Sequence, residues 1–406
     1  MRISLVSEHA NPLAALGGAD AGGQNVHVAA LAEGLARRGH DVVVHTRRDN
    51  PTAPTTTIGP GGYTVQLVPA GPPTDVPKDD LLPHMPAFAR HLARQWRTTP
   101  PDVVHAHFWM SGLAARDATR GIGVPMVQTF HALGAVKRRQ QGVRDTSPRV
   151  RVNLERRLCA EVDHVIATCR DEVVELRALG LPDERADVVP CGVDLTLFRA
   201  HPPRRGRGHR LLVIGRLVMR KGVGNVIEAL ADVPDVELTV AGGPTADALG
   251  ADPEAGRLMS LARDLGVSER VRFVGGVGRE QVPVLMGGAD IVVTVPWYEP
   301  FGIVPLEAMA SARPVVGSAV GGLLDTVLPG VTGDLVPPRR PDLLADSLRG
   351  LLGDPARCAE MGREGRRRVE KFFSWDRVVA RHEQVYAEVV ARHDGAVLTT
   401  TARSTR

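Results

Sequence analysis

Two glutamates in the stretch "EPFGIVPLEAMASARPVV" have the spacing and setting to hold a polar ligand. Glu299 and Glu307 stand eight positions apart, and Pro300 directly follows the first of them. A proline disfavours helical backbone at the residue before it, so Glu299 is expected in a loop. Pro305 suits the first position of a helix, which would place Glu307 in the first turn. The helix dipole alone stabilises a glutamate there, so Glu307 taken singly does not indicate a ligand.

The backbone between the two glutamates adds an anion site. The amides of Gly302, Ile303 and Val304 are predicted to point out of the start of the helix, where they favour a negatively charged group. A carboxylate beside such amides can accept hydrogen bonds from two hydroxyl groups. Amides for phosphates and carboxylates for hydroxyls together predict a pocket for a sugar nucleotide.

Two cations follow a strand predicted for residues 210–214. The stretch "VIGRLVMRKG" places Arg216 and Lys221 just beyond the carboxyl end of that strand. An arginine fork and a lysine point charge together suit a diphosphate, whereas the alternative is a pair of solvated surface charges. The position in the fold favours function. The chain has no D-x-D sequence and no His/Cys/Asp cluster with ligand spacing, so no metal is predicted and these cations would stabilise a leaving diphosphate.

A glycine-rich segment, "LGGADAGGQNVHVAALAEGLARRGH", joins the predicted first strand to the first helix. Gly17, Gly18, Gly22 and Gly23 let the backbone approach a ligand closely, and the amides at the helix start favour a phosphate. The alternative is a flexible turn. The spacing is not G-x-G-x-x-G, and no well-placed acid follows for a ribose, so a nicotinamide site is disfavoured.

Histidines mark the ends of two further predicted strands. His105 and His107 end a strand near residues 102–106, and His131 follows a strand over residues 124–130. Carboxyl ends of strands line the ligand crevice of an open α/β sheet, although local hydrogen bonds are the favoured explanation of His105. Lys137–Arg139 come next. Such a charge run is usually a solvated helix face, but beside a crevice it could attract phosphates or lipid head groups.

The elements that must position these residues form two successive β/α alternations. Near-continuous Val- and Ile-rich runs indicate strands buried on both faces, hence parallel sheets with helices on either side. The stretch "HPPRRGRGHR" between the alternations has no apolar period and is predicted to be a linker. We therefore predict an α/β protein with two Rossmann-like domains facing a cleft. The predicted domains are residues 1–200 and 209–374, with a final helix over residues 375–391 and a disordered tail over residues 394–406.

The bulk composition excludes several classes of protein. A chain of 406 residues exceeds what one hydrophobic core usually supports. The net charge of +4 is mild and aromatic residues make up only 4%, which argues against a nucleic-acid binder and suits phosphate-bearing ligands or an anionic membrane surface. Four cysteines without a C-x-x-C pair are read as reduced thiols of a cytoplasmic protein, and no stretch is long enough to span a membrane.

With these motifs in place, the chain resembles the retaining glycosyltransferases of family 4, which have the GT-B fold. The resemblance extends over residues 1–393. Its most specific parts are "GGADAGGQNVHV", "TFHALGAVK", "GRLVMRKG" and "EPFGIVPLEAMASARPVVGSAVGG", the last matching the E-x7-E motif of that family. It implies a final helix, residues 375–393, that crosses back to the first domain.

The resemblance also implies roles for single residues. His131 would lie beside the donor sugar, Arg216 and Lys221 would stabilise the departing diphosphate, and Glu299 would hold sugar hydroxyls. Glu307 would hold the nucleotide ribose. The implied backbone contacts to the donor come from Gly22, Gly23, Phe301, Gly302, Ile303 and Val304.

Within the family the chain is similar to the D-inositol-3-phosphate glycosyltransferases and the sucrose-phosphate synthases. That similarity implies a small, phosphorylated acceptor bound by Asn25, Lys78 and Arg151, although each charge has a solvated loop position as its alternative. The sequence departs from the inositol-phosphate pattern at Phe108, which lacks the expected aromatic hydroxyl, and at Ala132, which replaces a threonine. Both changes remove hydrogen-bond donors, so they count against an inositol phosphate as acceptor.

The resulting prediction is a metal-independent, cofactor-free retaining glycosyltransferase that uses a UDP-sugar and a small acceptor. Three alternatives stay open at this point. A sugar-nucleotide epimerase shares the two-domain architecture, a non-catalytic nucleotide-sugar sensor would keep the binding residues, and a lipid acceptor would add a peripheral membrane contact.

Overall fold

The computed structural model describes residues 1–14, 22–202 and 208–404, with the side chains of the last helix described as far as residue 395. The chain forms two compact units, Met1–Pro190 together with the C-terminal segment from Trp375, and Cys191–Ser374. Residues 191–200, predicted for the first domain, thus belong to the second unit, because the Val193 amide donates to the Phe373 carbonyl and Phe198 is buried in the second unit's core. Gly17, Gly18 and the centre of the predicted linker lie outside the described residues.

The first unit is built on a sheet that, in the part of the chain described, has eight strands in the order β3-β4-β2-β1-β5-β6-β7-β8. All neighbours are parallel except β3 and β4. The sequence did not predict β3, because a three-residue edge strand is too short to show a period. The strands are β1 (Arg2–Val6), β2 (Asp41–Arg47), β3 (Thr56–Ile58), β4 (Thr64–Val68), β5 (Val103–His107), β6 (Met126–Thr129), β7 (His164–Ala167) and β8 (Ala186–Val188).

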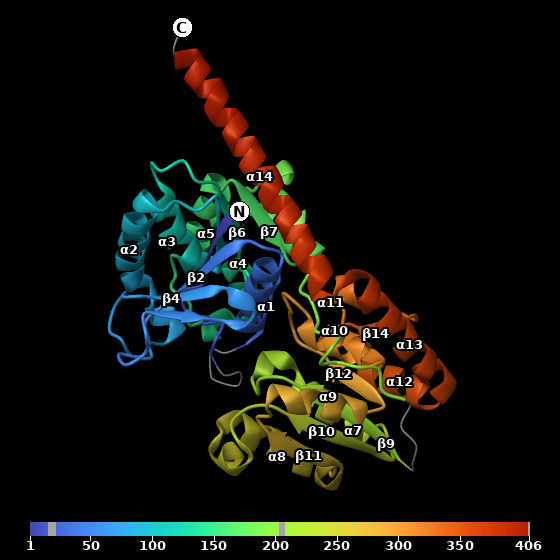
Figure 1. Ribbon diagram of the computed structural model, residues 1–406. Coiled ribbons are helices and arrows are strands. Elements are labelled where there is room, and N and C mark those ends of the chain that lie inside the picture. The colour runs from blue at the N-terminus through green and yellow to red at the C-terminus, as the bar shows by residue number, and fades with distance from the viewer. Residues whose placement is uncertain (15–21, 203–207, 405–406) are drawn as a thin grey trace. The chain divides into compact units, whose positions relative to one another are not determined.

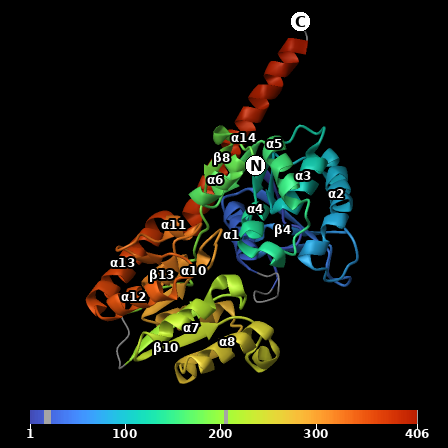
Figure 2. The same ribbon diagram turned by 180° about the vertical axis from the view of Figure 1, so that it is seen from behind.

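Helices cover both faces of this sheet, as the apolar strands require (Figures 1 and 2). One face packs against α1 and α14 through a core cluster that includes Leu5, Leu31 and Tyr386. The other face packs against α2, α3, α5 and α6 through a second cluster. The helices are α1 (Gly23–Arg37), α2 (Met85–Thr98), α3 (Trp109–Thr119), α4 (Gly134–Gln141), α5 (Arg151–Glu161), α6 (Arg170–Ala178) and α14 (Trp375–Ser404).

The last helix, α14, joins the first unit as predicted, and it approaches α1 closely at Gly34. A Cβ atom at Gly34 would lie 2.5 Å from a methyl group of Val379, so only glycine fits there without movement. Helix α14 continues to Ser404, well past Ala391, so the prediction of a disordered tail from residue 394 does not hold for the described residues. No proline occurs between Trp375 and Ser404, so no residue of this helix lacks a backbone donor for the hydrogen-bond ladder.

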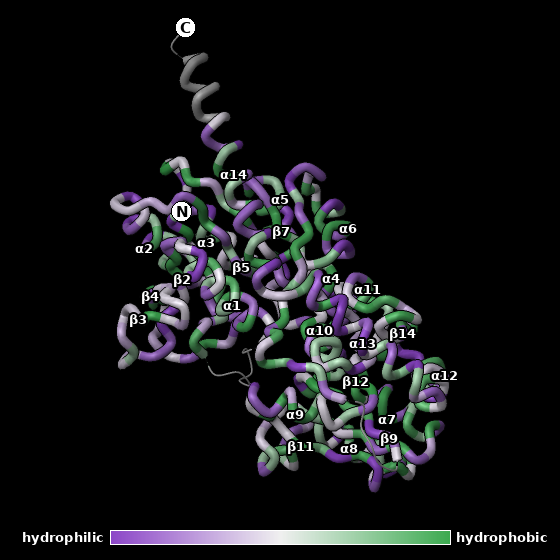
Figure 3. Tube along the Cα trace, turned by 45° about the vertical axis from the view of Figure 1, so that its right-hand side comes forward, coloured by the Kyte–Doolittle hydropathy of each residue, from purple (hydrophilic) through white to green (hydrophobic). Residues whose placement is uncertain are grey.

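The second unit carries another parallel sheet, which among the described residues has six strands in the order β11-β10-β9-β12-β13-β14. Helices α7, α8 and α12 pack on one face and α9, α10 and α13 on the other, and the apolar strands can be followed in Figure 3. The strands are β9 (His209–Ile214), β10 (Val236–Ala241), β11 (Val271–Gly275), β12 (Ile291–Thr294), β13 (Val315–Ser318) and β14 (Gly333–Val336). The helices are α7 (Val223–Ala231), α8 (Pro253–Asp264), α9 (Val282–Gly287), α10 (Ile303–Ala310), α11 (Leu323–Thr326), α12 (Pro341–Leu352) and α13 (Pro355–Phe372). None of the described helices is both long and apolar enough to cross a membrane.

Candidate functional site

The carboxyl edge of the second unit's sheet brings together the predicted cations and one predicted glutamate. Lys221 lies in a short 3₁₀-helix after β9, and Glu299 lies in the loop after β12. Strands β9 and β12 are parallel neighbours, so their carboxyl ends are adjacent. The Lys221 Nζ donates a close hydrogen bond to Glu299 Oε2, and the two side chains are only 23% and 12% exposed. The sequence predicted Lys221 and Glu299 as separate parts of the site, and the fold brings them together as an ion pair.

The ion pair stays charged, but burial works against it. Burial lowers the pKa of Lys221, the Glu299 carboxylate raises it, and the nearby charges of Arg220 and Arg216 lower it further. Burial also raises the pKa of Glu299. The Lys221 charge and hydrogen bond, Arg220 and the Phe301 amide outweigh that effect and hold this pKa below its usual value. Lys221 and Arg220 thus act on the Glu299 carboxylate, while Arg216 acts on Lys221. This excess of positive charge suits a diphosphate.

Glycines fix the loop that carries Glu299. Gly302 adopts a left-handed backbone conformation, with φ of 74°, as the N-cap of α10. The Gly322 amide donates to the Glu299 carbonyl over 2.8 Å. A Cβ atom at Gly321 would lie 2.2 Å from that carbonyl oxygen, so the glycine pair after β13 permits the close approach. The Glu299 backbone is thus held from the neighbouring strand.

Helix α10 begins earlier than the sequence predicts. It starts at Ile303, so Pro305 is its third residue and Glu307 its fifth. Pro305 is tolerated because the first four amides of a helix have no intrahelical acceptor. Glu307 therefore lies beyond the first turn, and stabilisation by the helix dipole explains a glutamate at this position less well than expected. The core cluster beneath α10 packs against the side chains of Phe301, Ile303 and Val304. At the start of the helix, these residues therefore have their backbone, not their side chains, to offer to a ligand.

Glu307 is almost completely buried and pairs with Arg279, a residue that the sequence did not single out. The Arg279 Nη1 donates to Glu307 Oε1 over 2.8 Å. Burial raises the pKa of Glu307, while the Arg279 charge and hydrogen bond oppose that rise. Arg279 follows β11 much as Arg216 follows β9, and this position after a strand is the signal that could have drawn attention to it.

The first unit places His131 in a cluster of buried histidines. His131 follows β6 with a positive φ of 61° and is 3% exposed. Its Nε2 lies 2.9 Å from His107 Nδ1, and the His27 ring centroid is 5.3 Å away. His382 from α14 contacts the His27 ring. His105 hydrogen-bonds Tyr386 and Thr129, which confirms the structural explanation of that residue.

Burial keeps these imidazoles neutral. It lowers the pKa of His131 and His27 well below the usual value, and the neighbouring histidines lower it further. Burial likewise lowers the pKa of His107 to about 3 and that of His382 to about 4. A neutral imidazole can donate or accept one hydrogen bond at each nitrogen, so this cluster can orient a hydroxyl group but carries no charge near pH 7. The sequence patterns did not single out His27 or His382, whereas His107 was placed at the end of a strand that lines the predicted crevice.

The predicted acceptor cations converge on Phe108. Lys78 Nζ lies 5.8 Å and Arg151 Cζ 5.0 Å from the centroid of the Phe108 ring. Arg151 is buried, donates from Nε to Glu155 over 2.8 Å, and donates a close hydrogen bond to the Ala132 carbonyl. The two positions at which the chain departs from the inositol-phosphate pattern are thus both in contact with Arg151.

The remaining polar residue predicted for the acceptor, Asn25, takes part in the start of α1. Its Oδ1 accepts from the Gly22 amide over 3.0 Å, and its Nδ2 donates to the Asn11 carbonyl over 3.0 Å. Helix α1 begins at Gly23, and a Cβ atom at Gly22 would meet no atom of the described residues within 4 Å. The side chain of Asn25 therefore serves the fold locally.

The basic run after His131 is largely paired. Lys137 Nζ lies 3.1 Å from Asp145 Oδ1 and donates to Ser147 Oγ over 2.8 Å. Arg139 forms a close ion pair with Glu175. Two of the three charges thus tie α4 to its surroundings, and membrane contact by this run stays a prediction.

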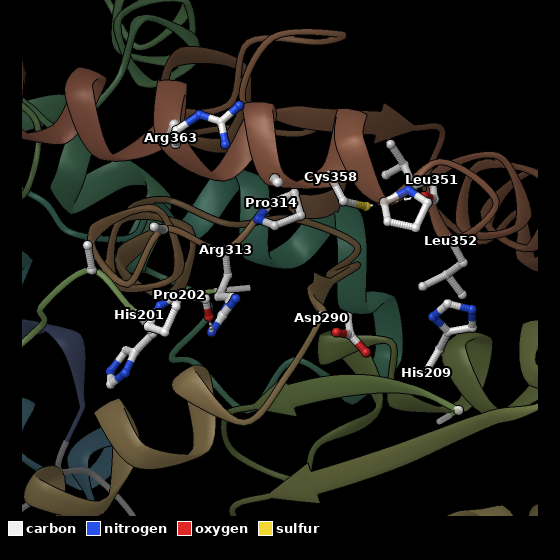
Figure 4. Close-up of a pocket in the computed structure, with 15 residues that line it drawn as sticks. His201, Pro202, His209, Asp290, Arg313, Pro314, Leu351, Leu352, Cys358 and Arg363 are labelled. Atoms are coloured by element: carbon white, nitrogen blue, oxygen red, sulfur yellow. Dashed lines mark hydrogen bonds between the residues drawn. The ribbon is translucent and has the colours of Figure 1, made fainter. Parts of the chain in front are cut away.

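A cavity of about 580 Å³ in the second unit lies away from these residues (Figure 4). His209, Asp290 and Pro314 line it, and they precede or begin β9, β12 and β13, so it opens at the amino-terminal edge of the sheet. It includes none of the residues predicted for the site. Among the described residues, no group of three or more His, Cys, Asp and Glu side chains is arranged to hold a metal ion.

Comparison with known families divides the chain much as the two units do. Residues 21–197 match the family described as Glycosyltransferase Family 4, and residues 196–368 match the family described as Glycosyl transferases group 1. A D-inositol 3-phosphate glycosyltransferase of Mycobacterium avium (strain 104) is 37% identical over 388 residues, which cover 92% of this chain and 91% of that protein. The corresponding enzyme of Xylanimonas cellulosilytica is 35% identical and covers 96% of this chain and 97% of its own.

A solved structure agrees with these sequence relatives. The sucrose-phosphate synthase of Thermosynechococcus elongatus superposes with a TM-score of 0.88 and 31% identity, covering 96% of this chain and 99% of that one. The two parallel Rossmann-like sheets thus correspond to those of an enzyme with the GT-B fold.

Proposed function

The chain belongs to glycosyltransferase family 4, and from that premise we propose that it moves a hexosyl group from a nucleotide-diphosphate sugar to a hydroxyl of a small, phosphorylated acceptor. The observation that carries the proposal is the Lys221–Glu299 pair with Arg216 nearby, at the carboxyl edge of a parallel sheet. This membership in a transferase family disfavours an epimerase and a non-catalytic sensor. The choice of a UDP-sugar rests on the family resemblance.

The pair suggests how the donor is received. In the free protein Lys221 is bonded to Glu299. An arriving diphosphate offers Lys221 and Arg216 further anionic oxygens, and Glu299 can then accept hydrogen bonds from sugar hydroxyls. Excess positive charge at the diphosphate stabilises it as it leaves with the electron pair of the anomeric carbon–oxygen bond.

The transfer step proposed here retains the anomeric configuration. The bond from the anomeric carbon to the diphosphate oxygen breaks, and the acceptor oxygen forms its bond on the face that the diphosphate vacates. The acceptor hydroxyl proton passes to the leaving diphosphate, so charge and atoms balance without an enzyme nucleophile. The neutral His131 is proposed to orient a sugar hydroxyl by hydrogen bonding.

The proposed acceptor carries a phosphate, and Lys78 and Arg151 support this part. Both cations lie over the Phe108 ring. Arg151 donates hydrogen bonds to Glu155, Ala132 and Ser147, and these three bonds leave further guanidinium N–H groups for a ligand. The names of the two similar enzymes, a D-inositol 3-phosphate glycosyltransferase and a sucrose-phosphate synthase, both contain a phosphorylated sugar or polyol. Phe108 and Ala132 supply no hydroxyl donor, so a phosphate held mainly by cations is proposed.

A matrix of donors and acceptors tests the proposal. UDP-glucose, UDP-N-acetylglucosamine and GDP-mannose are each incubated with inositol phosphate, fructose 6-phosphate and their unphosphorylated forms, in EDTA. Mass spectrometry detects product and NMR reports its anomeric configuration. We expect product with a phosphorylated acceptor, without added metal and with retained configuration. If folded protein neither binds nor consumes any of the three donors, the proposal fails.

A further inference from the structure

Glu307, to which the proposed function gives the nucleotide ribose, is held by one side chain from a different part of the second unit. It lies in α10, 4% exposed, and the structure gives it a single side-chain hydrogen bond among the residues described, from Arg279 to Oε1. Oε1 has a second lone pair, and Oε2 is not engaged by that bond. The carboxylate is therefore fixed at one oxygen and can still accept hydrogen bonds from two neighbouring hydroxyls.

Arg279 is itself fixed by its surroundings. It opens the short 3₁₀-helix Arg279–Gln281, whose start is capped where the Gly278 amide donates to Gln281 Oε1 over 3.1 Å. Its guanidinium carbon lies 5.3 Å from the ring centroid of the fully buried Phe198. The charge of Arg279 also helps to lower the pKa of Asp194. A planar group held between the Phe198 ring and the Glu307 carboxylate presents its N–H groups in one orientation.

We propose that Arg279 is a positioning residue for the donor, which orients the Glu307 carboxylate and keeps it ionised to accept the vicinal hydroxyls of a nucleotide ribose. This assignment rests on the proposed function. Its physical reason is that a nearly buried carboxylate without a partner tends to be protonated, and a protonated carboxyl group accepts hydrogen bonds less well. Among the described residues, Arg279 is the charged group that acts on this carboxylate, and it alone donates a side-chain hydrogen bond to it.

The test compares Arg279→Met with the wild type in titrations of UDP and 2′-deoxy-UDP, and of GDP and 2′-deoxy-GDP. We expect UDP or GDP to bind roughly tenfold more weakly to Arg279→Met, because a hydrogen bond from a charged group is lost. We also expect the ratio of the affinity for the ribonucleotide to that for the deoxyribonucleotide to fall toward one. In this variant, affinity for the ribonucleotide should improve as pH rises from 6 to 9, since the carboxylate form of Glu307 then increases. Arg279→Lys should recover part of the affinity.

Arg257→Met is the matched control, because Arg257 pairs with Glu254 in the same unit, within α8. It should leave both titrations unchanged. Thermal unfolding identifies variants that have lost the fold. The assignment is overturned if folded Arg279→Met binds the nucleotides as tightly as the wild type does. It is also overturned if the affinities for the ribose and deoxyribose nucleotides fall equally, because Arg279 would then not act through Glu307. A wild type that binds neither UDP nor GDP overturns the proposed function itself, and this assignment with it.

Discussion

The two units handle the buried polar groups proposed to receive the donor in opposite ways, although the first unit also buries the ion pair of Arg151 with Glu155. The site in the first unit gathers neutral imidazoles, among them His107, His131 and His382, whose pKa values burial lowers. The site in the second unit buries full charges and compensates them in pairs, Lys221 with Glu299 and Arg279 with Glu307. In the proposed function, the first arrangement orients hydroxyl groups without competing for anions, and the second exchanges a protein carboxylate for a diphosphate.

This difference has an energetic consequence. A buried ion pair that loses one partner leaves an uncompensated charge, whereas a neutral hydrogen-bonded group leaves only an unmet donor or acceptor. Substitutions at the carboxyl edge of the second unit should therefore have the larger effects. The predictions below test this contrast in order of decreasing effect.

The largest effect is expected at Lys221. Lys221→Met removes the charge nearest Glu299 and a cation proposed for the leaving diphosphate, so kcat/KM should fall about 10²- to 10³-fold. Steady-state assays of nucleotide release measure this. Lys371→Met, which removes an exposed lysine from α13, should leave the rate unchanged. Equal activity of Lys221→Met and wild type would show that the charge pair has no part in transfer.

The two glutamates should separate in a donor screen. Glu299→Gln should change the preference among sugars, because Glu299 is proposed to contact the sugar hydroxyls. Glu307→Gln should weaken all donors with the same base about equally, by roughly tenfold, because the ribose is common to them. Competition assays with several donors measure both. Identical donor profiles for the two variants would contradict this division of roles.

The neutral histidines predict how stability depends on pH. The folded pKa values of His45, His107 and His382 are about 3, 3 and 4, below an unfolded value near 6.5. The unfolded chain therefore binds more protons in this window. The contribution of these neutral histidines to the free energy of unfolding is complete above pH 6.5 and is lost as the pH falls from 6.5 toward 4. Each histidine lowers the folding equilibrium constant by up to about tenfold for each pH unit in this window.

Denaturant titrations between pH 8 and 5 measure this dependence. His45→Gln should reduce the slope by one proton, and since His45 packs against Trp96 rather than near His131, it should leave donor binding unchanged. A free energy of unfolding that stays level below pH 6.5 would mean that the imidazoles are protonated in the folded state.

The smallest effect is expected at the proposed acceptor phosphate. Phe108→Tyr and Ala132→Thr introduce hydroxyl groups beside Arg151, and the double variant should bind inositol phosphate about five- to tenfold more tightly than the wild type. Measurements of KM for phosphorylated and unphosphorylated acceptors separate a phosphate effect from a general one. If both acceptors improved alike, the hydroxyl groups would not be acting on a phosphate.

The sequence predicted the parallel sheets well where strands were apolar and long enough. The strand predicted for residues 210–214 occurs as β9, His209–Ile214, and the strand predicted near residues 102–106 occurs as β5, Val103–His107. Strand β13, Val315–Ser318, was missed because it follows closely on the apolar helix α10, and β14 was missed because its sequence, GDLV, is not a continuous apolar run. The segment 191–200 was assigned to the wrong unit, because its tertiary hydrogen bond from Val193 to Phe373 spans a distance in sequence that no local pattern reveals.

For the candidate site, the sequence identified residues but not their partners. The types and positions of Lys221 and Glu299 indicated a ligand, yet their mutual ion pair depends on the adjacency of β9 and β12. Arg279 lay outside every motif considered, so its bond to Glu307 emerged only from the fold. The histidine cluster was underestimated for the same reason, since His382 comes from α14 and reaches the first unit's sheet through tertiary packing.

The central claim, that Lys221 helps the second unit receive a diphosphate, can be tested directly by ³¹P NMR. UDP is titrated with wild-type protein and with Lys221→Met, in EDTA. We predict that the β-phosphorus resonance shifts on binding to the wild type, and that Lys221→Met reduces both the shift and the affinity. No response with the wild type, or the same response with both proteins, would contradict this account.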